Sequence, residues 1–144
     1  MQAVVIDERE LEAFRQTLPD YRQHEYYRFL WLYWDVVKGL YLVQRYPRPL
    51  DRLQVADAAR AYGFEQALED GSMGLFSIDV QAAMSEQVDL GRPVLLARVR
   101  LKERGKLHLL LIDGMHRLYK ATRQSRETLP CFVLTPAEEM LCRC

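Results

Sequence analysis

The clearest alternation of apolar and polar positions lies in the C-terminal third of the chain. In residues 94–101 apolar side chains recur at every second position, which predicts a strand with one buried face. The charged stretch 102–105 ends in a glycine and predicts a hairpin turn, and the apolar residues 107–112 predict its returning strand. The expected inner face of that strand consists of Leu107, Leu109 and Leu111. The apolar stretch 129–134 predicts a further strand inside the same sheet.

Two helices are expected around these strands. Residues 115–124 follow a tight turn at once, and their apolar positions recur at helical spacing. The expected inner side of this helix consists of Leu118, Ala121 and Thr122. Asp79 is a residue type that caps helices, so a shorter helix is expected to run from Asp79 to Val88, before Gly91 and Pro93. This order of strands and helices predicts an α/β (α+β) fold.

The first 70 residues show helical spacing instead. The apolar spacing of residues 11–18 predicts a helix that Pro19 ends. From Tyr26 to Tyr41, aromatic and aliphatic residues follow a helical stripe and predict a second, aromatic-rich helix. Apolar residues off that stripe, such as Trp31, give this helix a second face. That face is expected either to pack in the core or a homodimer, or to stack a base or bind a partner protein. A third helix is expected within residues 51–70.

The composition of the chain changes near the sequence Pro47-Arg48-Pro49. Residues before it are rich in aromatics, and those after it are smaller. A chain of 144 residues suffices for one domain, or for one domain with an extension. We therefore expect a helical extension at residues 1–70, packed on the same core, and a second module at residues 71–144.

Charge and cysteine content exclude several classes of protein. The 20 basic and 20 acidic side chains give a net charge near zero, which disfavours a protein that coats duplex DNA. Three cysteines cannot form a self-contained disulfide framework, and they suit a reducing cytosol. The most apolar stretch, 29–43, is interrupted by Asp35 and Lys38, so no membrane span is expected. The expectation is a cytoplasmic protein without a membrane partner.

The turn between the strand 107–112 and the helix after it is the segment that carries chemistry. The amide groups of the helix's first turn have no intrahelical acceptor, and Gly114 leaves room for a phosphate oxygen. His116 and Arg117 add donors and positive charge. For Asp113 two roles are open: it binds Mg²⁺ beside a polyphosphate, or it caps the helix through backbone amides. The alternative for His116 and Arg117 is that they only form a solvated first turn. If they bind phosphate, Arg117→Ala is expected to abolish nucleotide turnover while hardly changing stability.

The stretch Leu110–Ala121 resembles the signature of the ParB/sulfiredoxin superfamily, in which a strand ends in a small-residue turn followed by His-Arg or Arg-Arg and then Ala. The flanking stretches 91–94 and 129–133 also resemble that family's strand sequences. The resemblance covers residues 72–136 and implies a mixed sheet with helices. The helical N-terminal segment has no counterpart in it.

The resemblance implies a nucleotide site that holds ATP or CTP, usually with Mg²⁺. Carried over residue by residue, Gly114, Met115, His116 and Arg117 would hold phosphate, and Asp113 would hold the metal. Met115 stands where sulfiredoxins place the attacking cysteine, so sulfiredoxin chemistry is not expected. No helix-turn-helix domain follows within the sequence, so a centromere clamp is not expected either.

What remains is a small ParB-like enzyme of a plasmid, phage or other mobile element. It would be a hydrolase that cleaves ATP, a nuclease with DNA as its substrate, or a kinase of a small hydroxyl compound. The alternative is a non-catalytic regulator that binds a partner, or a second copy of itself, through the Tyr26–Tyr41 helix. A third hypothesis is a nucleic-acid binder that uses the basic hairpin.

Several further residues are candidates for function. Glu86 would be a second carboxylate that acts as a base and deprotonates water or a hydroxyl group, or would simply lie on a solvated face. A set of basic residues would contact DNA or a triphosphate, or would be solvated. They are Arg98, Arg100, Lys102, Arg104, Lys106, Lys120, Arg123 and Arg126. Cys142 and Cys144 are expected to lie in a frayed terminus.

Overall fold

The computed structural model describes residues 3–29, 32–61, 80–100 and 107–144. Two compact units are formed, and each combines segments that are distant in the chain. Unit 1 consists of Met1–Pro49, Leu95–Asp113 and Phe132–Cys144. Unit 2 consists of Leu50–Val94 and Gly114–Cys131.

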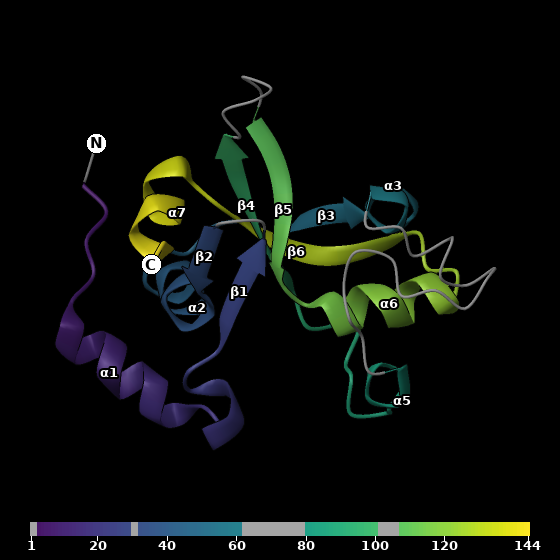
Figure 1. Cartoon of the computed structure of the whole chain (residues 1–144), viewed down its shortest axis with the longest axis horizontal. Helices are drawn as coiled ribbons and strands as arrows, with labels where there is room; N and C mark the ends of the chain where they lie inside the picture. The colour runs from purple at the N-terminus through teal and green to yellow at the C-terminus, as the bar shows by residue number, and fades with distance from the viewer. Residues whose placement is uncertain (1–2, 30–31, 62–79, 101–106) are drawn as a thin grey trace. The chain divides into compact units, whose positions relative to one another are not determined.

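Helices and strands alternate along the described chain (Figure 1), which confirms the mixed α and β class. The helices are α1 (Glu8–Thr17), the short 3₁₀ helix η1 (Asp20–Arg22), α2 (Val36–Arg45), α3 (Val55–Ala61), α5 (Val80–Ala83), α6 (Met115–Arg123) and α7 (Pro136–Cys142). The strands are β1 (Tyr26–Phe29), β2 (Leu32–Asp35), β3 (Asp51–Gln54), β4 (Val94–Arg100), β5 (Leu107–Asp113) and β6 (Thr128–Leu134). Strands β1 and β2 form one sheet, and a mixed sheet has the order β3-β6-β4-β5. None of the helices in the described ranges is long and apolar enough to cross a membrane.

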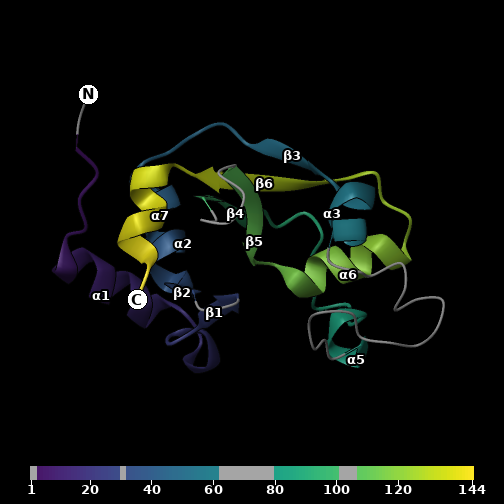
Figure 2. The ribbon, with the colours of Figure 1, turned by 45° about the horizontal axis from the view of Figure 1, so that its top comes forward.

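The core of unit 1 lies among α1, α2, α7 and the strands β4 and β5. Its fully buried side chains include Trp34, Val37, Leu42 and Leu134. Helices α2 and α7 lie side by side (Figures 1 and 2). A Cβ atom on Gly39 of α2 would lie 2.7 Å from a methyl group of Leu95, so the absence of a side chain there permits this close packing.

The expected helix from Tyr26 to Tyr41 is wrong in its first half. Residues 26–29 and 32–35 form the antiparallel hairpin β1–β2, in which Tyr26 lies opposite Asp35. The Asp35 side chain accepts hydrogen bonds from the amides of Val37 and Lys38, so the helix begins only at Val36. Aromatic residues pack well on a pleated surface, and here pairing between strands overrides the helical stripe.

Other expected helices are shorter than the sequence pattern suggests. The first part of the stretch 51–70 is the strand β3, which pairs antiparallel with β6, and the helix α3 covers only Val55–Ala61. Residues 62–79 lie outside the described ranges. The helix expected from Asp79 to Val88 is described only as α5, Val80–Ala83. The pairing partner of β3 is almost 80 residues away in the sequence, so no local pattern marks this strand.

The strands and the helix expected in the C-terminal third are confirmed as β4, β5, β6 and α6, with β6 inside the sheet. The hairpin turn 102–105 lies outside the described residues. The expected inner face of β5 is wrong at Leu109, which is half exposed. Leu110 and Ile112 belong to the core instead.

The expectation of a frayed C-terminus is also wrong. Residues 136–142 form α7, which begins with a reciprocal capping box between Thr135 and Glu138. Cys142 is fully buried, and Trp34 donates a hydrogen bond of 2.7 Å to Glu139. These contacts integrate the end of the chain into unit 1, and Cys144 remains exposed.

Candidate functional site

The expected chain reversal lies where β5 ends and α6 begins. Gly114 has a φ of 115°, in the left-handed region that favours glycine. A Cβ atom at this position would lie 2.5 Å from a methyl carbon of Val94. Glycine is therefore required by the backbone conformation and by packing against Val94. Close approach of a phosphate oxygen, the reason expected from the sequence, is not needed to account for this glycine.

The first turn of α6 presents backbone amides in unit 2. Gly114 is the N-cap residue and has no side chain that could accept from them. The first intrahelical bond runs from the Leu118 amide to the Gly114 carbonyl, at 2.9 Å. The amides of residues 115–117 come before this first bond in the chain, so they have no intrahelical acceptor. The helix dipole adds partial positive charge to them. Amides of this kind are the donors that helix N-termini offer to anions.

The Arg117 side chain is held over this turn rather than extended into solvent. The residue is 7 % exposed, and its Nη1 donates to the carbonyl of Arg92 at 3.0 Å and to the carbonyl of Pro93. Its Nη2 lies 3.2 Å from the position that a Cβ atom of Gly114 would occupy. The guanidinium therefore connects α6 to the backbone just before β4. The expectation of a solvated arginine is wrong at this residue.

The two residues between Gly114 and Arg117 differ in exposure. His116 is exposed, whereas Met115 is half buried. His116 is therefore the side chain of this turn that a ligand in solvent can reach.

Asp113 belongs to unit 1, where it is 9 % exposed and pairs with Arg22. The Nη2 atom of Arg22 lies 2.9 Å from the Asp113 carboxylate, and its Nε atom lies 2.9 Å from Glu25. Burial alone would lower the pKa of Arg22, but the two carboxylates outweigh it and raise that pKa. The charge of Asp113 is thus balanced by a permanent cation.

This pairing bears on the expected magnesium site. Across the ranges that the structure describes, no group of three or more His, Cys, Asp or Glu side chains could hold a metal ion. The carboxylate expected to bind Mg²⁺ already faces a guanidinium. The residues present therefore do not fit a preformed magnesium site. Arg22 and Asp113 are 91 positions apart, so no sequence motif could have revealed the pair.

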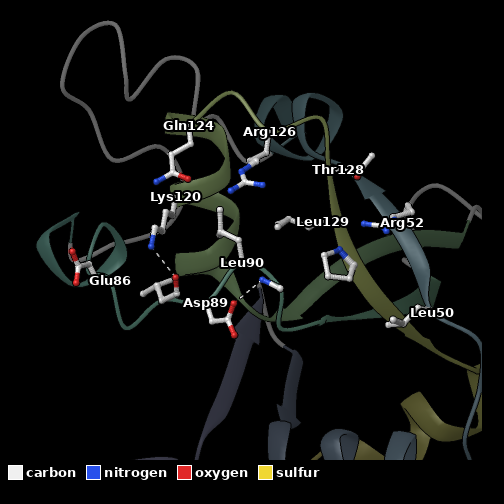
Figure 3. Close-up of a pocket in the computed structure, with 13 residues that line it drawn as sticks. Leu50, Arg52, Glu86, Asp89, Leu90, Lys120, Gln124, Arg126, Thr128 and Leu129 are labelled. Atoms are coloured by element: carbon white, nitrogen blue, oxygen red, sulfur yellow. Dashed lines mark hydrogen bonds between the residues drawn. The ribbon is translucent and has the colours of Figure 1, made fainter.

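Glu86 lies away from the turn. It is exposed and lines an open cleft of about 620 Å³ on unit 2 (Figure 3). Residues 114–117 do not line this cleft. The candidate base and the candidate phosphate site are therefore in different places, and Glu86 is not brought to the turn.

The residues expected to form a basic patch have different surroundings where the structure describes them. The Lys120 ammonium donates to the carbonyls of Ser85 at 2.9 Å and Val88 at 2.8 Å. Arg98, Arg123 and Arg126 are exposed. The side chains of residues 100–106 lie outside the description. Lys120, like Arg117, donates hydrogen bonds to backbone carbonyls. This role was not expected from the sequence, because the residue type alone does not indicate it.

Comparison of the chain with protein-family models, with curated proteins and with solved structures finds no match.

Proposed function

We propose that unit 2 binds the phosphate groups of a nucleotide at the first turn of α6. The observation that carries the proposal is the arrangement at Gly114: helix amides without a capping side chain, and a guanidinium held next to Gly114. Backbone amides at a helix N-terminus and a nearby arginine together favour a phosphate group. The sequence resemblance to the ParB/sulfiredoxin superfamily points to the same residues.

In this proposal each residue of the turn has its own role. The amides of residues 115–117 donate to phosphate oxygens, and His116 adds a contact from the solvent side. Arg117 is a positioning residue whose charge is held in place by the carbonyls of Arg92 and Pro93. Charge that grows on a phosphate during hydrolysis or transfer would be stabilised by these donors. The resemblance supports ATP or CTP as ligand, and ATP hydrolysis, phosphoryl transfer or DNA cleavage as activity.

The non-catalytic alternative loses the feature on which it depended. It required one aromatic helix from Tyr26 to Tyr41, and residues 26–29 and 32–35 form the antiparallel strands β1 and β2 instead. The nucleic-acid hypothesis depends on the hairpin tip at 102–106, which lies outside the described residues. Phosphate binding at α6 is therefore the function that we carry forward.

The test is to place a negative charge where the phosphate is expected. His116→Glu puts a carboxylate in the first turn, where it interacts favourably with the helix dipole and so preserves folding, but it repels a phosphate. His116→Gln removes the imidazole without adding charge. Ala61→Glu, at an exposed position of α3, is the control for the added charge.

Thermal shift and phosphate release are measured with ATP and with CTP, each with and without Mg²⁺. A ligand present at about 100 times its Kd stabilises the native state by about 2.7 kcal/mol, which raises the melting temperature measurably. We expect the shift in the unmodified chain and in Ala61→Glu, and a loss of at least about tenfold in affinity in His116→Glu. Equal shifts in His116→Glu and His116→Gln would contradict phosphate binding at this turn.

A further inference from the structure

The cleft of unit 2 is a second concave surface, separate from the first turn of α6. Its volume of about 620 Å³ lies in the range typical of small-molecule sites. Four segments form it (Figure 3): residues 50–52 at the start of β3, residues 86–91, the second half of α6, and residues 126–130, which lead into β6. None of the roles assigned above involves this cleft.

One part of the cleft is an apolar surface. Leu129 is almost fully buried, and Leu90 and Pro130 are half buried beside it. Pro130 lies opposite Arg52 in the antiparallel pair β3–β6. The apolar surface that is open to a ligand therefore comes from Leu90 and Pro130, and Pro130 lies next to an arginine. Such a surface suits a ring or another apolar body of a ligand.

Two arginines border this apolar surface. Arg52 and Arg126 are exposed, and Figure 3 shows them on either side of Leu129. Within the described residues neither guanidinium pairs with a carboxylate. The third cation of the lining, Lys120, is already committed to backbone carbonyls. Arg52 and Arg126 therefore remain as cations that a ligand can use.

The carboxylates of the lining come from the segment 86–91, away from β3. Asp89 accepts a hydrogen bond of 2.8 Å from the Gly91 amide. Glu86 lies beyond Lys120 in Figure 3, on the far side from Arg52. The cleft is thus polarised, with free cations on the β6 side and carboxylates on the side of the segment 86–91. An anionic group is favoured only at the first of these.

We propose that this cleft binds a small phosphate monoester with a ring or other apolar body. The phosphate would contact Arg52 and Arg126, and the apolar body would lie against Leu90 and Pro130. A phosphate monoester carries close to two negative charges at neutral pH, which matches two guanidinium groups better than a single carboxylate does. Guanidinium groups also bind phosphate through paired hydrogen bonds. This site is independent of the nucleotide site proposed at α6.

The experiment uses phenyl phosphate as probe with the full chain at low salt. Inorganic phosphate supplies the anion without the ring, phenol supplies the ring without the anion, and benzoate replaces the phosphate by a carboxylate. The variants are Arg52→Gln, Arg126→Gln and the double variant. Arg123→Gln is the matched control, because Arg123 is an exposed arginine of α6 that does not line the cleft. Affinities are measured by isothermal titration calorimetry, and circular dichroism checks that the variants fold.

We expect phenyl phosphate to bind at least about tenfold more tightly than each of the three other probes. The double variant is expected to lose about tenfold or more in that affinity, while Arg123→Gln stays within about twofold. Affinity retained by the double variant, or inorganic phosphate binding as tightly as phenyl phosphate, would overturn the proposal. Absence of binding of phenyl phosphate at millimolar concentration would overturn it as well. The Arg52→Gln/Arg126→Gln double variant is expected to keep the thermal shift with ATP, and His116→Glu is expected to keep the part of phenyl phosphate binding that depends on Arg52 and Arg126. The failure of either proposed site is therefore recognised separately.

Discussion

Arg117→Ala provides the most direct test of how the turn at Gly114 is built. An arginine on a solvated first turn would cost almost nothing when truncated. In the structure the side chain is buried, and its guanidinium donates to the carbonyls of both Arg92 and Pro93. Truncation to alanine removes both hydrogen bonds, so the carbonyls of Arg92 and Pro93 lose the donor that Arg117 supplies.

The size of the effect follows from these two contacts. A hydrogen bond from a charged donor contributes about 1.5 kcal/mol or more to stability, so losing both lowers the free energy of unfolding by about 3 kcal/mol. For a chain of this size that corresponds to a drop of about 10 °C in the melting temperature. Arg117→Lys keeps the charge but not the planar donor group. Its free energy of unfolding is therefore expected to lie between those of the unmodified chain and of Arg117→Ala.

Urea unfolding followed by circular dichroism measures the effect. Arg123→Ala is the control, because Arg123 lies on the same helix and is exposed; it should stay within about 0.5 kcal/mol of the unmodified chain. A loss below about 0.5 kcal/mol for Arg117→Ala as well would refute the assignment of Arg117 as a positioning residue. The side chain would then be available as a simple ligand, as the sequence alone suggests.

Two further predictions concern buried groups. Burial alone would raise the pKa of Glu138, but hydrogen bonds from Arg48 and Thr135 hold that pKa below its ordinary value of 4.5. The stabilisation is therefore present above pH 4.5 and lost as the pH falls through the pKa of the folded state. Glu138→Gln should make the free energy of unfolding, measured in urea titrations, fall less steeply with pH below pH 4.5. An unchanged dependence of that free energy on pH would contradict this. Burial raises the pKa of Cys131 to about 11 and that of Cys142 to about 12. Iodoacetamide at about pH 8 should therefore label only Cys144 in the native protein and all three cysteines in urea, as counted by mass spectrometry; rapid labelling of a second cysteine in the native protein would show that a buried thiol is accessible.

Much of the candidate turn could be predicted from local sequence. The alternation in residues 94–100 and the apolar stretches 107–112 and 129–134 marked β4, β5 and β6. The glycine between a strand and a helical pattern marked the reversal at Gly114. These features depend on backbone geometry and on neighbours only a few positions apart, so the chain order carries the information.

Other features could not be predicted in this way. The aromatic residues 26–35 fit a helical stripe, and only pairing between β1 and β2 made them strands. The strand β3 exists because β6 lies beside it. In both cases backbone hydrogen bonds to another segment outweighed a weak local preference.

By itself the sequence determined where the apolar strands of the C-terminal third run and where the chain must reverse, because steric limits on φ and the periodicity of side chains act locally. The tertiary structure alone decided what the charged side chains do. Asp113 pairs with Arg22. Arg117 and Lys120 donate hydrogen bonds to backbone carbonyls. Arg52 and Arg126 remain exposed beside an apolar surface. A buried charge must find an opposite charge or a hydrogen-bond partner, and that partner comes from whichever segment folding brings near.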